Sequence, residues 1–140
     1  MAVTVNKITN PEELQKAFDI RVKVFVEEQG VDKRLEYEHE DVSHHFIAKI
    51  NGEPAGTARW RETDKGIKLE RFAVYPDKRG MKVGEALVDV VLNDIKDTSK
   101  KIYLHAQSQV VDFYKKYGFE TEGEEFEEAG IKHFVMVLKK

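Results

Sequence analysis

The chain has 140 residues, 41% of them apolar and 35% charged, and 23 basic against 26 acidic residues give a formal net charge of -3. This size and composition predict one domain, residues 1–140, with a single core. The evenly mixed charges exclude the one-sided basic surface of nucleic-acid-binding proteins. The absence of cysteine excludes disulfides, thiol catalysis and a cysteine-based zinc site. No segment resembles a signal peptide or a membrane span, so we expect a cytoplasmic protein without a membrane partner.

The first third of the chain predicts a strand, a helix and a charged loop. Residues 3–8 alternate as a short strand does, and Asn10 with Pro11 is a favourable helix start. Apolar side chains then follow at helical spacing, at Leu14, Ala17, Phe18, Val22 and Phe25. Residues 27–43 lose this period, which predicts a short helix and a long loop of the kind that often carries function.

Strands dominate the middle of the chain. Residues 45–50 lead into Asn51-Gly52, a strong hairpin turn, and residues 54–61 and 67–74 form two further strands. The simplest arrangement of the three is an antiparallel meander.

The last part of the chain alternates helices with strands. A helix after residue 80 presents an apolar face, and residues 102–106 form a strand, which implies a parallel crossover. Residues 108–117 predict a short helix with Ser108 as its N-cap, and residues 119–128 and 131–138 predict a closing hairpin. The fold class is therefore α/β (α+β), with a mixed sheet and helices on both sides.

The start of the helix after residue 80 is a candidate anion site. It has no obvious capping residue, two glycines (Gly80 and Gly84) allow close approach, and Lys78, Arg79 and Lys82 add positive charge. Such a helix start can hold a pyrophosphate, although it is neither a Walker loop nor a dinucleotide fingerprint. The alternative is a solvated basic turn.

Two segments resemble the motifs of GNAT acetyltransferases. Residues 74–87 resemble the acetyl-CoA motif, Arg/Gln-x-x-Gly-x-Gly/Ala after a strand that ends in a proline turn. Residues 110–120 resemble the second signature, Phe-Tyr-x-x-x-Gly-Phe, and the two occur in the family's order. One position departs from the acetyl-CoA motif, because Lys82 stands in place of its middle glycine. The lysine side chain could crowd the pyrophosphate, or it could point outward and pair with it. Residues 21–29, 103–107 and 127–133 are similar to the small bacterial ElaA-like (YjcF-like) branch.

The resemblance implies a GNAT fold over the whole chain. That fold is a mixed, mostly antiparallel sheet of about seven strands, with about four helices on both faces. The sheet splays between its fourth and fifth strands, and the pantetheine arm of acetyl-CoA lies in the gap. Implied cofactor-binding residues are Phe72, Ala73 and Val74 along the arm, and Arg79, Gly80, Lys82, Val83, Gly84 and Glu85 at the pyrophosphate.

Catalytic residues follow from the same resemblance. Tyr114 is the candidate acid that protonates the departing sulfur, or else a core aromatic. Glu70 shares a strand face with Phe72 and Val74 and is the candidate base, unless it is an ordinary surface charge or the proton leaves through water. His105 is a second candidate base.

Residues of the first helical region are candidates for acceptor binding. Arg21 and Gln29 could hold the acceptor, Arg21 by pairing with a carboxylate, although a structural ion pair of Arg21 is the alternative. The spacing of His39, Asp41, His44 and His45 matches no standard metal site, so we expect solvated loop histidines and no metal.

The sequence thus predicts acetyl transfer from acetyl-CoA to a primary amine by direct attack in a ternary complex. The acceptor could be a small molecule or a protein, and the enzyme a monomer or homodimer. The alternatives are a non-catalytic CoA-binding module and acyl transfer from another acyl-CoA.

Overall fold

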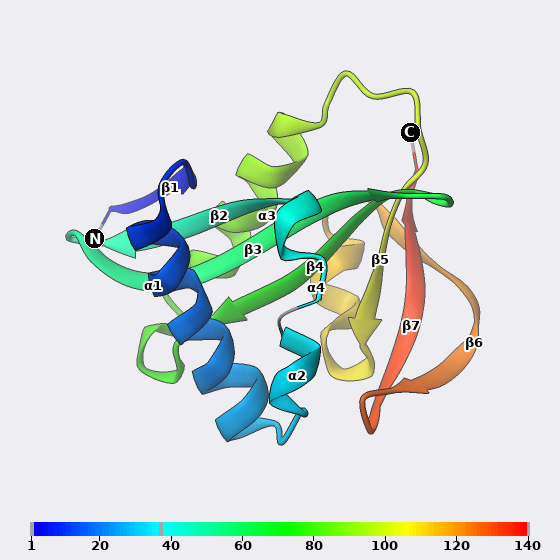
Figure 1. Cartoon of the computed structure of the whole chain (residues 1–140). Helices are drawn as coiled ribbons and strands as arrows, with labels where there is room; N and C mark the ends of the chain where they lie inside the picture. The colour runs from blue at the N-terminus through cyan, green and yellow to red at the C-terminus, as the bar shows by residue number, and fades with distance from the viewer. Residues whose placement is uncertain (1, 37, 140) are drawn as a thin grey trace. The chain divides into compact units, whose positions relative to one another are not determined.

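The computed structural model describes residues 2–36 and 38–139 and contains a seven-stranded sheet (Figure 1). The strand order is β1-β2-β3-β4-β5-β7-β6, with β4 and β5 parallel. The strands are β1 (Val3–Lys7), β2 (Ser43–Ile50), β3 (Glu53–Thr63), β4 (Gly66–Val74), β5 (Ile102–Gln107), β6 (Phe119–Glu128) and β7 (Ile131–Leu138). The α-helices are α1 (Pro11–Arg21), α2 (Lys33–Glu36), α3 (Val83–Asp94) and α4 (Val111–Lys115). This order confirms the predicted fold class.

Local sequence explains the first helical region. The Asn10 side chain accepts a hydrogen bond from the Glu13 amide at 2.9 Å, so the predicted N-cap is confirmed. The helix does not remain regular, because residues Val22–Glu28 form a π-helix, η1, directly after α1. A π-helix is rare and often marks a functional site.

One predicted cap is wrong. Residues Ser108–Val110 form a 3₁₀ turn, η4, and α4 begins only at Val111, with Val110 as its N-cap. The Ser108 hydroxyl donates instead to the Glu125 carboxylate at 2.6 Å. The remaining 3₁₀ turns are η2 (Glu40–Val42) and η3 (Pro76–Lys78).

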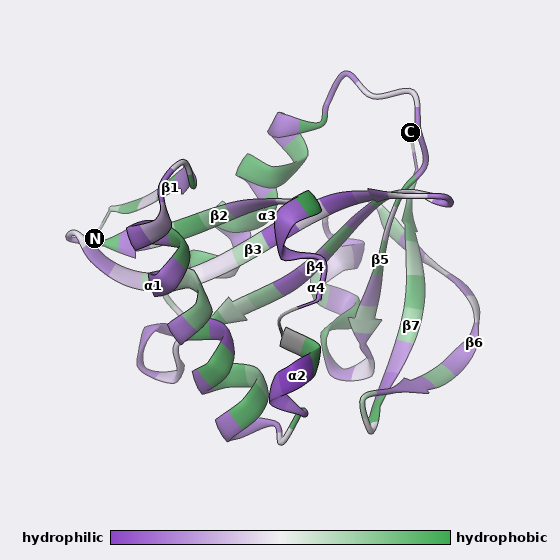
Figure 2. Ribbon diagram, viewed as in Figure 1, coloured by the Kyte–Doolittle hydropathy of each residue, from purple (hydrophilic) through white to green (hydrophobic). Residues whose placement is uncertain are grey.

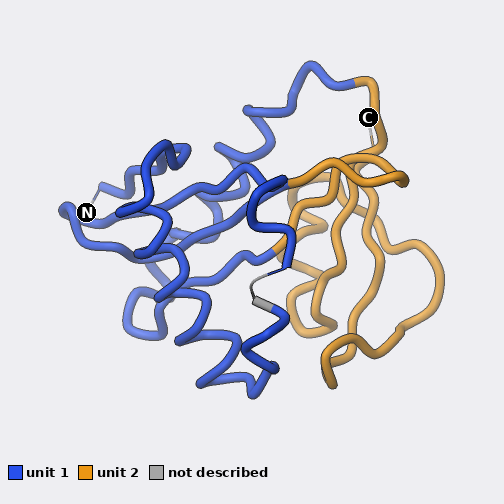
Figure 3. The backbone as a smooth tube through the Cα atoms, in the orientation of Figure 1, with its two compact units in different colours: residues 1–60, 71–98 blue, residues 61–70, 99–140 orange. Residues whose placement is uncertain are grey.

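The chain divides into two compact units (Figure 3). Unit 1 contains residues 1–60 and 71–98, and unit 2 contains residues 61–70 and 99–140. Strands β3 and β4 each continue from one unit into the other. No helix in the described ranges is both long and apolar enough to cross a membrane.

In unit 1, helices cover both faces of the strands (Figure 1). On one face, Ile20 of α1 and Val24 of η1 pack against Ile47 of β2 and Ala73 of β4. On the other face, α3 lies so close to β3 that a Cβ on Gly56 would stand 2.8 Å from a Val83 methyl carbon. The glycine is what permits this close packing.

In unit 2, one sheet face is apolar and the other is mixed, with titratable side chains next to valines. The register aligns Leu69 with Leu104 and Leu104 with Met136, all three buried, and the Tyr114 ring of α4 lies 6.1 Å from the ring of Phe119. The opposite face carries Lys68 and Glu70 on β4. The titratable residues of the other strands on this face are His105 on β5, Glu128 on β6 and His133 on β7. Outermost, β6 is mostly exposed and acidic, in contrast with the apolar β7 (Figure 2).

Candidate functional site

The start of α3 has the features expected of an anion site. Lys82 is the N-cap residue and makes no side-chain capping hydrogen bond. The first amide to bond back into the helix is that of Ala86, which donates to the Lys82 carbonyl at 3.1 Å. The amides of Val83, Gly84 and Glu85 precede it, at the positive end of the helix dipole. A Cβ on Gly80 would meet nothing within 4 Å, so the approach to these amides is open on that side.

Lys82 adopts the backbone conformation that explains the glycine of the family motif. Its φ is 64° and its ψ is 26°, which is the left-handed region. Glycine enters this region without the Cβ clash that other residues suffer. Lys82 therefore retains the motif's backbone path and presents an exposed, cationic side chain.

Arg79 is held by a carboxylate of the π-helix. Its two terminal nitrogens donate to the two oxygens of Glu28, at 2.7 and 2.6 Å. These hydrogen bonds hold the pKa of the Glu28 carboxyl below its usual value. A phosphate that binds the terminal nitrogens of Arg79 must therefore share them with Glu28 or displace it.

At the end of β4, next to Arg79, one edge of the backbone faces away from β3. The Tyr75 amide donates to the Ala55 carbonyl of β3 at 2.9 Å. Because successive amides of a strand point to opposite sides, the Val74 amide and carbonyl face away from β3. The Arg79 Nε donates to that Val74 carbonyl at 3.2 Å. Unit 1 therefore places the predicted arm-binding strand end beside a predicted pyrophosphate residue.

Glu70, in unit 2, is buried with 8% of its surface exposed. Its Oε2 accepts from Arg61 Nε at 2.9 Å, and its Oε1 lies 3.4 Å from Lys68 Nζ. Its burial removes the alternative of a solvated surface charge. The two cations favour the ionised carboxylate and also occupy its oxygens.

Tyr114 lies on α4 and is 7% exposed. Burial raises the pKa of its phenol. The hydroxyl therefore holds its proton at neutral pH, as a proton donor must, and the ring packs in the apolar layer against Phe113 and Phe119.

Arg21 takes part in a buried ionic cluster of unit 1. Arg21 and Arg59 are both 0% exposed, and both donate to Oε1 of Glu40, Arg59 at 3.0 Å. The Arg21 guanidinium also lies 4.2 Å from the centre of the Phe18 ring. His45 is buried too, with Nε2 3.1 Å from the Glu40 carbonyl oxygen. This arrangement is the structural ion pair that the sequence left open for Arg21.

The other residues of the first helical region have separate places. The Gln29 backbone ends the π-helix, since its amide donates to the Val24 carbonyl at 3.1 Å. His44 stacks on Trp60 with the ring centres 3.9 Å apart, whereas His39 is exposed. The expectation of solvated loop histidines is therefore wrong for His45. Among the described residues, no group of three or more histidines and acids could hold a metal ion.

Three partners were missed by sequence reasoning: Glu28 on Arg79, Glu40 on the buried arginines, and Glu128 on His105. All three are acids in highly charged segments, where nothing in the local pattern distinguishes them. The contacts span 51, 19 and 23 positions of the chain. Only the folded arrangement could identify them.

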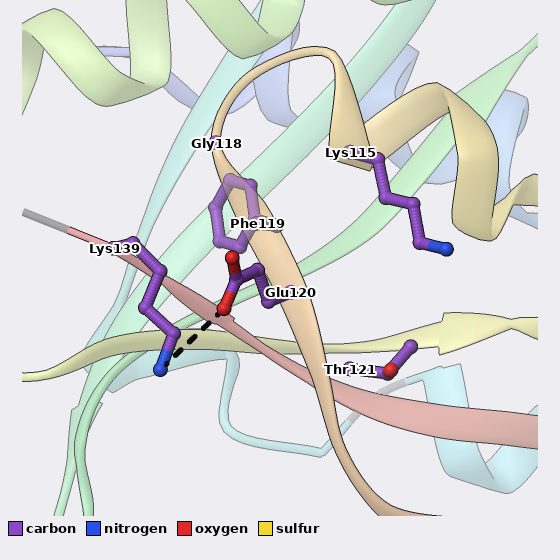
Figure 4. Close-up of a pocket in the computed structure, with 6 residues that line it drawn as sticks. All are labelled: Lys115, Gly118, Phe119, Glu120, Thr121 and Lys139. Atoms are coloured by element: carbon purple, nitrogen blue, oxygen red, sulfur yellow. Dashed lines mark ion pairs between the residues drawn. The ribbon is translucent and has the colours of Figure 1, made fainter.

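A surface pocket of about 600 Å³ lies where α4 leads into β6 (Figure 4). Its lining residues are Lys115, Gly118, Phe119, Glu120, Thr121 and Lys139. Glu120 and Lys139 form an ion pair across it at 3.8 Å. None of the predicted site residues lines this pocket, so we assign it no part in the chemistry.

Comparison with known proteins identifies the family. A sequence profile of the acetyltransferase (GNAT) domain matches residues 7–140. The chain is 37% identical over 131 residues to the uncharacterized N-acetyltransferase YjcF of Bacillus subtilis, covering 91% of this chain and 94% of that protein. It is 30% identical over 132 residues to the protein ElaA of Escherichia coli, covering 89% and 86% respectively.

Solved structures agree with this result. The crystal structure of Escherichia coli ElaA has a TM-score of 0.87 at 25% identity and covers 99% of this chain and 100% of that chain. An acyl-CoA N-acyltransferase from Pseudomonas aeruginosa has a TM-score of 0.83 at 23% identity, covers 99% of each chain, and supports the fold alone. The chain therefore belongs to the GNAT family of N-acetyltransferases, enzymes that transfer an acyl group from an acyl-CoA to an amine.

Proposed function

We propose that the protein is a cytoplasmic enzyme that transfers an acetyl group from acetyl-CoA to a primary amine by direct attack in a ternary complex. The observation that carries the proposal is the uncapped, cationic start of α3 beside the outward-facing edge of Val74. Helix-start amides without a side-chain cap suit a pyrophosphate, and an outward-facing strand edge suits an amide-containing arm.

Named residues would hold acetyl-CoA at two places. The amides of Val83, Gly84 and Glu85 would donate to the pyrophosphate, with Arg79, Gly80 and Lys82 beside them. The backbone of Phe72, Ala73 and Val74 would hydrogen-bond the pantetheine arm as an added strand does. The Glu85 side chain is itself anionic, so its contribution is limited to the backbone amide.

Acetyl-CoA supplies a thioester, an activated acyl group. The Val74 amide would donate to the thioester oxygen, and such a donor, aimed where negative charge develops, lowers a barrier by about 3 kcal/mol. Tyr114 would donate its proton to the departing sulfur. Burial raises the pKa of its phenol, which keeps the proton on the oxygen at neutral pH and makes the phenol a weaker acid.

The sequence predicts Glu70 as a candidate base, with proton loss through water as the alternative. Its two oxygens are engaged by Arg61 and Lys68, so a proton could reach it only if one of these ion pairs opens. Replacement by glutamine keeps the shape and removes the basicity, so Glu70→Gln tests this role.

Arg21 and Gln29 are the proposed acceptor-side residues. Arg21 is buried against Glu40, so it would act by holding the loop that carries Glu40. Its direct contact with an acceptor would require that ion pair to open.

The test is thiol release with acetyl-CoA and a panel of amines: L-lysine, spermidine, tryptamine and a peptide with a free N-terminus. The protein has no cysteine, so a thiol reagent detects only free CoA. We expect amine-dependent release, with acetyl-CoA preferred to longer acyl-CoAs. Tyr114→Phe should lower kcat about 100-fold and leave CoA affinity unchanged. Wild-type kcat in Tyr114→Phe would remove Tyr114 from the mechanism, and tight CoA binding without turnover on any amine would indicate a CoA-binding module.

A further inference from the structure

We propose that His105, held by Glu128, is the group that accepts the proton from the attacking amine. This inference rests on the proposed function and concerns a residue pair within unit 2. His105 Nδ1 lies 3.0 Å from Glu128 Oε2. An ionised carboxylate accepts hydrogen bonds and cannot donate one, so Nδ1 carries the proton and Nε2 carries the lone pair.

The strand register puts His105 at a particular place in the sheet. The parallel pairing of β4 with β5 aligns Ile67 with Ile102 and ends with Leu69 opposite Leu104. Glu70 and His105 are the next residues on the two strands, and both side chains belong to the mixed face. Along the chain, Glu70 stands two residues before Phe72, the first of the residues proposed to hold the pantetheine arm.

The imidazole of His105 is oriented by its surroundings. The ring of Phe126 meets it edge-on at 5.2 Å, and the ring of Tyr103 lies 6.0 Å away. With Glu128 on Nδ1, three groups from β5 and β6 restrict the ring, while about a quarter of the side chain stays exposed at 24%. A fixed tautomer with an accessible second nitrogen is the arrangement of a general base.

Glu128 is suited to hold His105. The hydrogen bond from His105 is the main cause that keeps the pKa of the Glu128 carboxyl below its usual value, with Lys68 and His133 as further positive influences. His133 is turned away from this role, because its Nδ1 pairs with the Ile131 carbonyl oxygen at 2.7 Å.

The charged groups on this face favour His105 over Glu70 as the proton acceptor. Both oxygens of Glu70 face cations, Arg61 at 2.9 Å and Lys68 at 3.4 Å. Both oxygens of Glu70 are thus engaged by cations, whereas the imidazole of His105 is held by Glu128 at Nδ1. Glu128 thus acts as a positioning residue, and His105 acts on the acceptor.

The proton balance is complete. An alkylammonium acceptor loses two protons as the N–C bond forms and the C–S bond of the thioester breaks. One proton ends on the departing sulfur, and the other leaves the nitrogen through His105 Nε2 to solvent. No oxidant, reductant or metal is needed.

The kinetic test compares His105→Asn, Glu128→Gln and Glu70→Gln with the wild type over pH 5–9, roughly the range in which histidine titrates. The acceptor is the panel amine acetylated fastest, at saturating acetyl-CoA. His105→Asn should lower kcat about 100-fold and remove the acidic limb of the pH profile. Glu128→Gln should lower kcat about tenfold, because the lost carboxylate no longer fixes the proton of His105 on Nδ1. His44→Asn, a histidine of unit 1 stacked on Trp60, serves as the matched control with an unchanged profile.

A second measurement needs no acceptor. Long-range ¹H–¹⁵N spectra of the imidazoles should show the proton of neutral His105 on Nδ1, and a proton on Nε2 would overturn the proposal. So would a wild-type profile in His105→Asn, or loss of the acidic limb in Glu70→Gln instead. A wild type that neither binds acetyl-CoA nor releases thiol would contradict the proposed function, whereas normal turnover with an unaffected His105→Asn would contradict only this inference.

Discussion

Lys82 makes a prediction that separates backbone strain from charge. Its φ of 64° is left-handed, the conformation that glycine adopts without cost. Lys82→Gly removes both the strain and the charge, and Lys82→Ala removes the charge alone. The difference between the two variants therefore isolates the backbone contribution.

The magnitude follows from two opposing effects. A residue with a Cβ pays about 1–2 kcal/mol in the left-handed region. Glycine also destabilises the folded protein by about 0.5–1 kcal/mol, because it makes the unfolded chain more flexible. The free energy of unfolding of Lys82→Gly should therefore exceed that of Lys82→Ala by about 0.5–1 kcal/mol. Its melting temperature should be about 2–4 °C higher. CoA affinity should fall about three- to fivefold in both variants, since each loses one exposed positive charge.

Urea unfolding and calorimetric titration with CoA measure the two quantities. Lys16, an exposed residue inside α1, supplies a control of opposite sign. The Lys16→Gly variant should be about 1 kcal/mol less stable than the Lys16→Ala variant. Equal stability of Lys82→Gly and Lys82→Ala would refute the strain argument. Tighter CoA binding by both variants than by the wild type would instead show that the Lys82 side chain crowds the phosphates.

Three further substitutions test other parts of the structure. Glu40→Gln should cost about 3 kcal/mol in urea unfolding, because it leaves two buried guanidinium groups without their shared anion, and an unchanged stability would contradict the importance of that cluster. Gly56→Ala should cost about 1–3 kcal/mol, because its Cβ would stand 2.9 Å from the Ala73 carbonyl oxygen, and a neutral result would show that α3 can shift. Glu28→Gln should tighten CoA binding a few-fold, because it weakens the partly exposed ion pair that occupies Arg79. Weaker CoA binding would mean that Glu28 positions Arg79 for the phosphates.

Local patterns were sufficient to predict the elements of the fold. The alternation in β1, the Asn10-Pro11 start of α1 and the Asn51-Gly52 hairpin each express a preference of a few neighbouring residues. The failure at Ser108 has a non-local cause. A hydroxyl can cap a helix or bond elsewhere, and here Glu125 on β6 takes it.

The site could be predicted only in part. The proposed anion site at the start of α3 rests on missing caps and nearby cations, and both can be recognised in the sequence. The left-handed backbone of Lys82 is not visible in a lysine, and only the family motif suggests it. The contact of Glu128 with His105 depends on strand register, and that of Glu40 with Arg59 depends on where the turn η2 lies over β3, and no local pattern fixes either.

Calorimetric titration of the wild type and of Arg79→Ala with acetyl-CoA tests the central claim most directly. The proposed function predicts micromolar binding by the wild type and a loss of about tenfold or more in Arg79→Ala, since a cation that pairs with phosphate contributes about 1.5–3 kcal/mol. Absence of binding to the wild type would contradict an acetyl-CoA-dependent enzyme. Equal binding by both proteins would contradict the placement of the pyrophosphate beside Arg79.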